Sequence, residues 1–253
     1  MICGSPDDAA ADGGGESFYR LRLAGVELNC GFAFEETPCY FGQYCRGPFS
    51  GRGSLAIPEW YWDVWQERIG PKDPHNEYSA MAAVCSAALT AYDRCVIHAA
   101  AIRFRDRAWL ISAPSGVGKS TLVRTLQEMW PDRFGVISGD RPVLELCQTE
   151  TVVHPSPWNG KEGWHGAPSA PLAALVLLER GDEDRLIALS PGEAALSVYT
   201  LLLQIAEDTH MLRRMGEMEE KILMSAPVWR LKDRDPVAAA KLLYAMMNGD
   251  EIS

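Results

Sequence analysis

Basic residues are scarce in this chain of 253 residues. Lys and Arg together number 24 against 34 Asp and Glu, so the formal net charge at pH 7 is −10. Proteins that bind nucleic acid need a basic face, and an anionic membrane surface attracts basic proteins for the same reason. The charge balance therefore argues against nucleic acid and against a membrane as partners. It leaves room for a small basic pocket that could bind a phosphate group.

Long apolar runs and cysteine motifs are missing as well. No apolar run approaches the ~20 residues that a membrane span requires. The first residues, "MICGSPDDAAADGGGE", have neither the cationic nor the apolar segment of a signal peptide, and we expect a disordered tail over residues 1–15. The seven cysteines are scattered and form no C-x-x-C pair, which argues against a zinc site and a disulfide framework. Free thiols in a reducing, cytoplasmic compartment are the simplest expectation.

Short apolar runs alternate with helical patterns from about residue 95 onward, which predicts an α/β core. Strands are predicted over 95–104, 107–113, 134–138, 143–147, 172–180, 185–189 and 228–231. Helices are predicted over 78–94, 120–130, 191–205 and 235–249, and over 208–226 with an interruption at Gly216.

Residues 16–76 have a different character from the rest. The stretch 17–35 alternates in the manner of β-strands, and 39–58 is interrupted by Gly and Pro. Trp60, Trp62 and Trp65 then lie close together, and we interpret them as a hydrophobic patch that packs this part onto the remainder, with a substrate-binding aromatic surface as the alternative. The predicted organisation is a tail over 1–15, a small β-rich region over 16–76 and a core over 77–253.

One stretch, "APSGVGKST" at 113–121, has the form of a phosphate-binding loop between a strand and a helix. Gly116 and Gly118 allow backbone angles that a Cβ would prevent, so that backbone N–H groups can surround an anion. The following helix adds the positive end of its dipole. Ala113 replaces the first glycine of G-x-x-x-x-G-K-[ST]. The residues predicted to contact the nucleotide are Ser115, Gly116, Val117, Gly118, Lys119, Ser120 and Thr121, with Ser120 also on Mg²⁺.

A reaction at such a loop also needs a carboxylate, and two candidates follow predicted strands. Asp140 comes after "FGVIS" and Glu179 after "ALVLL". Spacing alone does not separate them, since either could instead be an ordinary turn or strand-end residue. His98 lies in the run "VIHAAAI" on a predicted strand. A single His in an apolar strand is more often a core residue than a catalytic one.

Residues 97–122, "IHAAAIRFRDRAWLISAPSGVGKSTL", resemble the catalytic core of the HPr kinase/phosphorylase family. That core shares its fold with ATP-dependent phosphoenolpyruvate carboxykinase and has a Leu-His-Gly strand, a second strand and then G-x-S-G-x-G-K-S. Related bacterial proteins also carry "DDKP", a "TPW-GK" loop and a "PL-AI-LER" strand. Their counterparts here are 139–142, "SPWNGKEGW" at 156–164 and "PLAALVLLERG" at 171–181. The resemblance covers roughly residues 77–250.

The resemblance implies a phosphate-loop (P-loop) core with a mixed β-sheet and flanking helices, plus a small β-rich N-terminal region. It favours Asp140 over Glu179 as the catalytic acid/base, and it places His98 and Lys119 in the active site. Gly139 stands where the family has a first aspartate, so a reduced activity or an altered metal geometry is expected. The segment that marks the phosphorylase activity is not recognisable. The implied metal ligands are Ser120, Asp140 and Glu162, and the implied substrate or transition-state contacts are Lys161 and one of Arg141, Arg213 and Arg214.

The main hypothesis is an ATP- and Mg²⁺-dependent kinase that phosphorylates a hydroxyl. The acceptor would be a serine of a peptide or protein, or a small serine-like molecule. One alternative is a nucleotide-hydrolysing switch with Glu179 as its acidic residue, and another is a non-catalytic nucleotide-dependent peptide-binding module. No N-K-x-D pattern supports a GTPase. Association into a homo-oligomer is a further expectation, which rests on the resemblance alone.

Overall fold

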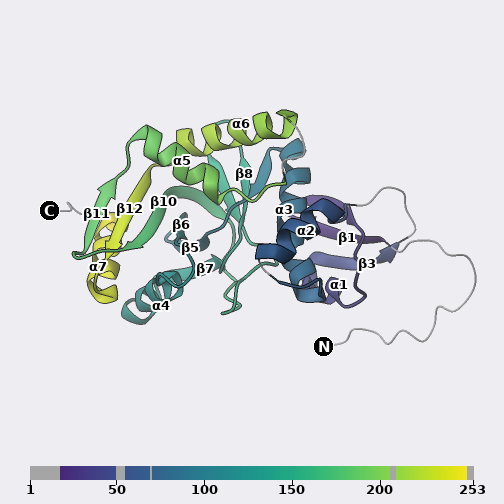
Figure 1. The fold of residues 1–253 in the computed structure, drawn as a ribbon. Coiled ribbons are helices and arrows are strands. Elements are labelled where there is room, and N and C mark those ends of the chain that lie inside the picture. The colour runs from purple at the N-terminus through teal and green to yellow at the C-terminus, as the bar shows by residue number, and fades with distance from the viewer. Residues whose placement is uncertain (1–17, 50–54, 69, 206–208, 250–253) are drawn as a thin grey trace, which may run out of the picture.

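The fold is mixed α/β (Figure 1). The computed structural model describes residues 18–49, 55–68, 70–205 and 209–249, and the predicted tail over 1–15 lies outside these residues. The larger sheet comprises nine strands in the order β4-β8-β9-β10-β6-β5-β7, with β12 paired to β10 and β11 paired to β12. These strands are β4 (Arg94–Val96), β5 (Ala100–Phe104), β6 (Arg107–Ser112), β7 (Phe134–Ser138), β8 (Val143–Leu146), β9 (Thr151–His154), β10 (Ala170–Arg180), β11 (Arg185–Ala188) and β12 (Val228–Asp233).

The sheet is mixed because β10 runs parallel to both β6 and β12, whereas its other pairs are antiparallel. The carboxyl ends of β6, β10 and β12 therefore lie at one edge of the sheet. Polar groups that follow parallel strands gather at such an edge, and ligands bind there in open α/β sheets. This arrangement positions the candidate site.

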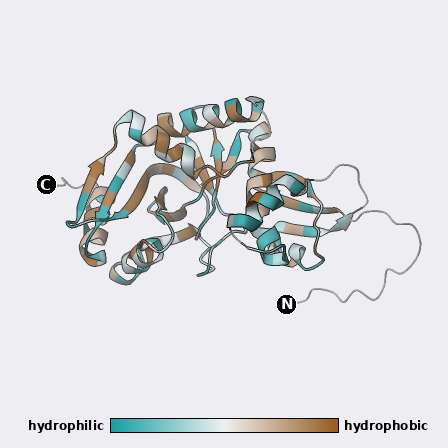
Figure 2. Cartoon of the chain, in the orientation of Figure 1, coloured by the Kyte–Doolittle hydropathy of each residue, from teal (hydrophilic) through white to brown (hydrophobic). Residues whose placement is uncertain are grey.

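Helices cover both faces of this sheet (Figure 1). The helices α5 (Pro191–Leu201) and α6 (Thr209–Ser225) pack into one apolar core, and α4 (Lys119–Met129) and α7 (Pro236–Asn248) pack into the other. Figure 2 shows hydrophobic residues along the central strands and a mixture of hydrophilic and hydrophobic residues on the covering helices. The alternation along β10 explains the two cores, because successive side chains of a strand point to opposite faces. Leu175 and Leu177 contribute to the α5 side, and Val176 and Leu178 to the α4 side.

The helix ends follow from local sequence. Ser190 and Glu193 form a reciprocal capping box at the start of α5, and Pro191 occupies its first turn. Asp235 caps α7, and Gly249 ends it with a φ of 80°. Gly216 does not interrupt α6, contrary to the sequence prediction, since one helix runs from Thr209 to Ser225. A single glycine costs a helix only about 1 kcal/mol, and the buried face of α6 outweighs that cost.

The predicted strand over 95–104 is divided in two, and this is a second correction. Its first part, β4, pairs with β8, whereas its second part, β5, pairs with β6 and β7. His98 lies in the break between them rather than on a strand. Both parts are apolar and short, so the sequence pattern does not reveal that the chain changes partners at this point.

A smaller sheet with the order β2-β1-β3 forms the N-terminal part, as its alternating pattern predicted. Its strands are β1 (Phe18–Leu23), β2 (Val26–Cys30) and β3 (Cys45–Phe49), and the nearby helices are α1 (Thr37–Tyr40), α2 (Glu59–Arg68) and α3 (Pro74–Leu89). Side chains of β1, β2 and α3 share one apolar core with Val96, Val143 and Trp158 of the larger part. Of the tryptophans on α2, Trp62 is buried while Trp60 is exposed. The division of the chain at residue 76 stays a prediction.

The carboxylate of Glu77 joins α3 to the N-terminal segment. It is buried and accepts hydrogen bonds from the backbone N–H groups of Ala33, at 2.6 Å, and Phe34, at 3.2 Å, and from the hydroxyl of Thr37. We expect Glu77→Ala to lower the free energy of unfolding by about 2 to 4 kcal/mol, because it removes the buried acceptor of three hydrogen bonds and leaves the buried hydroxyl of Thr37 without it. Urea unfolding measures the change. Glu128→Ala, on the exposed side of α4, is the control, and equal losses in the two variants would contradict this account.

Two sequence expectations concern the cysteine thiols and membrane-spanning helices. The thiols of Cys30, Cys45, Cys85, Cys95 and Cys147 are free, as expected. Burial raises the pKa of the Cys95 thiol to about 12, so this thiol is neutral and packs as an apolar group. In the described part of the chain, no helix combines the length and the apolar character that crossing a bilayer would demand.

Candidate functional site

The loop over 113–118 connects the end of β6 to the first residue of α4, Lys119. Gly116 and Gly118 have φ angles of 82° and 127°, which side chains rarely allow, so glycine is required at both positions. Ala113 is buried and is not among the described residues with positive φ, so an alanine fits there without strain. The loop therefore places its backbone and the N-terminus of an 11-residue helix at one point of the sheet edge.

Asp140 lies at the centre of a group of cationic side chains. The Nζ atom of Lys119 donates a hydrogen bond to Asp140 Oδ1 at 2.9 Å, and His98 Nε2 lies 3.2 Å from the same oxygen. Arg141 Nε lies 3.2 Å from Asp140 Oδ2 as an ion pair without hydrogen-bonding geometry, and Arg141 Nη1 donates to Ser79 O at 2.8 Å. The fixed positive charges of Lys119 and Arg141 therefore both lie against one carboxylate. The immediate surroundings of Asp140 are thus basic within an acidic protein.

These neighbours determine the ionisation of Asp140. Burial raises the pKa of this carboxyl, but the hydrogen bond with His98 and the charges of Lys119 and Arg141 outweigh burial and hold the pKa well below its usual value. Asp140 is therefore ionised throughout the neutral range. Because its pKa is lower in the folded than in the unfolded chain, its contribution to stability is present at neutral pH and is lost only as the pH falls into the acid range.

Backbone contacts fix His98 and Asp140 relative to each other. The N–H of Ala99 donates to Asp140 O at 2.8 Å, and the N–H of His98 donates to Leu201 O at 2.8 Å. The carbonyl of His98 accepts a hydrogen bond from Ser112 Oγ at 2.8 Å. His98 and Ala99 lie in the break between β4 and β5. Through these hydrogen bonds they connect Asp140, the end of α5 and Ser112, which directly precedes the 113–118 loop.

A long loop over 155–169 covers Gly139. A Cβ added to Gly139 would lie 2.2 Å from the carbonyl oxygen of Asn159, which is far inside van der Waals contact. Trp158 anchors this loop: its side chain is buried, and its Nε1 donates to Tyr78 O at 2.8 Å. Glycine at 139 is therefore required by the covering loop. An aspartate, as in the resembled family, would not fit without moving the backbone of Asn159.

Two predicted residues of this loop are Glu162 and Lys161. A Cβ on Gly160 would lie 3.2 Å from Asp140 Cβ and 3.9 Å from Glu162 Oε2, so Asp140 and Glu162 both border Gly160. Lys161 is exposed on the same loop. Among the described residues, no group of three or more His, Cys, Asp or Glu side chains could hold a metal ion. A site with few carboxylates is compatible with Mg²⁺, which usually keeps several waters and binds substrate phosphates.

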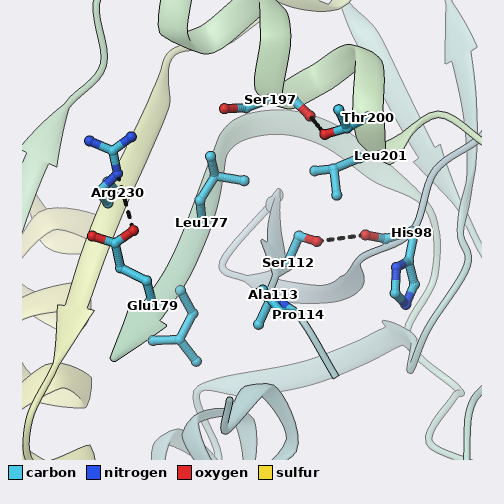
Figure 3. Close-up of a pocket in the computed structure, with 11 residues that line it drawn as sticks. His98, Ser112, Ala113, Pro114, Leu177, Glu179, Ser197, Thr200, Leu201 and Arg230 are labelled. Carbon is cyan, nitrogen blue, oxygen red and sulfur yellow. Dashed lines mark hydrogen bonds and ion pairs between the residues drawn. The ribbon is translucent and has the colours of Figure 1, made fainter. Parts of the chain in front are cut away.

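Glu179 lies apart from Lys119 in a cavity of about 370 Å³ (Figure 3). The cavity opens at the ends of β6, β10 and β12 on the face that α5 covers, and His98, Ala113 and Pro114 contribute to its lining. Glu179 Oε2 lies 3.4 Å from Arg230 Nε. The structure thus places Asp140, and not Glu179, against the loop lysine.

Two further residues reach the 113–118 loop and were not identified from the sequence. The guanidinium of Arg180, at the end of β10, would lie 3.4 Å from a Cβ on Gly118, and Arg180 Nη1 binds the buried Asp233 Oδ2 at 3.0 Å. Burial raises the pKa of Asp233, and Arg180 opposes that rise. Arg180 ends the predicted strand over 172–180, whereas Asp233 lies two residues beyond the predicted strand over 228–231, and the adjacency of β10 and β12 was not predictable.

The arginines proposed on α6 do not surround Asp140. Arg214 donates to Thr90 O at 2.6 Å and to Glu217 Oε2 at 2.7 Å, and it lies 3.5 Å from Asp93. Arg213 is exposed on the same helix. Arg141 is therefore the member of that set that lies beside Asp140.

Comparisons with known proteins add little to this description. No protein-family model matches the chain, and no curated protein matches it. Among solved structures, the chain is similar to the Hpr(Ser) kinase/phosphatase from Coxiella burnetii, with 14% sequence identity and a TM-score of 0.37 over 61% of this chain and 97% of that chain. At this identity and TM-score, the similarity carries no conclusion about the reaction, which has to be inferred from the residues of the site.

Proposed function

We propose that this protein is a kinase that transfers the γ-phosphate of ATP to a hydroxyl group. The observation that carries the proposal is the contact between Lys119 and Asp140. It joins a lysine at the start of a helix, directly after a glycine-dependent loop, to an ionised carboxylate. A lysine in that position can bind the β- and γ-phosphates, and a neighbouring carboxylate can accept the proton of the attacking hydroxyl.

In the proposed reaction, the bond between the γ-phosphorus and the β,γ-bridging oxygen breaks, and a bond from phosphorus to the acceptor oxygen forms. ADP leaves, and the hydroxyl proton passes to Asp140. Lys119 exchanges its contact with Asp140 for the phosphates, and Arg141 stabilises the charge on the transferring group. His98, 3.2 Å from Asp140, orients the carboxylate toward the acceptor.

The low pKa of Asp140 is compatible with this role. Phosphoryl transfer passes through a loose transition state in which the nucleophile needs little activation, so a weak base in the right position is sufficient. The arrival of a triphosphate also removes Lys119 from the carboxylate and adds negative charge nearby. Both changes raise the pKa of Asp140 from its low value in the free protein.

The residues present also fit a magnesium ion. Ser120 in the first turn of α4 and the carboxylates of Asp140 and Glu162 would hold it, together with phosphate oxygens. Bound there, it would neutralise charge on the phosphates. Arg180 Nη2 would lie 3.4 Å from a Cβ on Gly118, so Arg180 is suited to contact a phosphate chain bound at the loop.

The first test concerns Lys119. We expect Lys119→Ala to weaken ATP binding tenfold or more, about 1.4 kcal/mol, because the phosphates lose a charged ligand at the loop. Isothermal titration calorimetry measures the affinity, and Lys241→Ala on the exposed side of α7 is the matched control. Failure of the wild-type protein to bind ATP, or equal affinity of wild type and Lys119→Ala, would refute nucleotide binding at this loop.

A further inference from the structure

The cavity beside the candidate site has a distinct character at each of its two ends. One end is formed by His98 and Ser112, next to the 113–118 loop, and the other by Glu179 and Arg230. Leu177 and Leu201 line the space between them (Figure 3). A volume of about 370 Å³ is at the small end of the range for small-molecule sites. It suits a small molecule better than the surface of a folded protein.

Strand register determines how these residues are spaced. Ser112 pairs with Leu177 across β6 and β10, and Leu177 pairs with Arg230 across β10 and β12. Residues in register on neighbouring strands face the same side, and two strand spacings separate the backbones of Ser112 and Arg230 by about 10 Å. Glu179 follows Leu177 by two positions and faces that side as well. The distance between the charged end and His98 is therefore about the length of one small molecule.

The charged end contains Arg230 and Glu179, and both Glu179 and the neighbouring Glu193, which is not part of the cavity lining, pair only loosely with Arg230. Arg230 Nε lies 3.4 Å from Glu179 Oε2, and Arg230 Nη1 lies 3.5 Å from Glu193 Oε1. Charge-assisted hydrogen bonds are usually about 2.7–2.9 Å long, so both contacts are longer than the strong form. A guanidinium also has five N–H donors. Arg230 can therefore bind an anionic group of a ligand, and Glu179 a cationic group, without breaking a tight ion pair.

We propose that this cavity binds the acceptor of the reaction, and that the acceptor is a free hydroxy amino acid. This inference rests on the proposed kinase function. Arg230 would bind the carboxylate and Glu179 the ammonium group of the amino acid, while its hydroxyl points to His98 and Asp140. Ser197 and Thr200 line the α5 side of the cavity. Their hydroxyls donate to the carbonyls of Glu193 and Ser197, so toward a ligand they would act as hydrogen-bond acceptors. An acceptor within a peptide chain lacks these two charges on the reacting residue.

The test compares acceptors with γ-labelled ATP and the wild-type protein. The panel contains L-serine, L-homoserine and L-5-hydroxynorvaline, which differ in chain length, then N-acetyl-L-serine and L-serinamide, which each lack one charge, and a blocked serine tripeptide. We expect transfer to at least one free amino acid and a KM at least tenfold higher when either charge is blocked. Transfer to the blocked peptide but to none of the amino acids would overturn the inference while leaving the kinase proposal intact.

Two variants connect the selectivity to the cavity. We expect Arg230→Gln to raise the KM for the amino acid at least tenfold while the KM for ATP changes less than twofold, and Arg185→Gln, exposed on β11, to change neither. An unchanged KM for the amino acid in Arg230→Gln would overturn the assignment.

Saturation-transfer NMR with the amino acids and no nucleotide gives a readout independent of activity. The assignment is wrong if the wild-type protein transfers no label to the amino acids and also gives no NMR signal with them, or gives a signal that Arg230→Gln does not weaken. Loss of ATP binding alone counts only against the kinase proposal.

Discussion

Asp140→Asn is expected to lower the rate of γ-phosphate transfer by about 10³-fold while nucleotide binding persists. Asparagine preserves the shape of the side chain but cannot accept the hydroxyl proton. Removing the negative charge also frees Lys119, which Asp140 holds at 2.9 Å in the free protein. We therefore expect ATP to bind a few-fold more tightly to the variant when Mg²⁺ is absent. Single-turnover transfer of label measures the rate, and calorimetry measures the affinity.

The opposite signs of these two effects make the prediction specific. A variant that merely unfolds would lose binding and transfer together, whereas Asp140→Asn should separate them. Asp132→Asn, an exposed aspartate in the turn before β7, is the matched control and should change neither quantity. Equal transfer by wild type and Asp140→Asn would remove Asp140 from the role of proton acceptor. Rapid hydrolysis without an acceptor, abolished by Glu179→Gln, would instead favour a nucleotide-hydrolysing switch.

Gly139→Ala is expected to lower the free energy of unfolding by about 2 to 3 kcal/mol and to reduce transfer as well. The added methyl group would lie 2.2 Å from Asn159 O, and the nearest atoms belong to backbone, so no side chain can rotate away. The 155–169 loop must shift, and Gly160, which lies beside Asp140, shifts with it, as does Glu162 on the same loop. Chemical unfolding measures the stability, and the transfer assay measures the second effect.

Gly216→Ala is the matched control for this substitution. No atom lies within 4 Å of a Cβ at Gly216, which sits within α6. Alanine there should raise the stability by about 0.5 to 1 kcal/mol, since glycine is the poorer helix former. If Gly139→Ala were as stable as the wild type, the 155–169 loop would not be held over Gly139 as tightly as the contact with Asn159 indicates. The same contact with Asn159 O indicates that an aspartate at position 139 would not fit either.

Two wrong predictions illustrate where sequence patterns fail. The break at His98 was missed because β4 and β5 have the same apolar character, although they pair with different strands. The interruption of α6 at Gly216 was predicted from one residue, whereas burial of Met215, Met218 and Ile222 holds the helix together. In both cases, a contact between distant segments outweighed the local pattern.

The sequence by itself determined the identity of most strands and helices and the place of the loop at 113–121. Hydrophobic periodicity, turn residues and helix caps act over a few positions, and one chain contains them in full. Only the tertiary structure decided which carboxylate faces Lys119, why residue 139 is glycine, and that Arg230 and Glu179 share a cavity with His98. Those outcomes depend on the order of strands in the sheet and on the path of the 155–169 loop. Both are set by packing between residues far apart in the chain, which local patterns do not record.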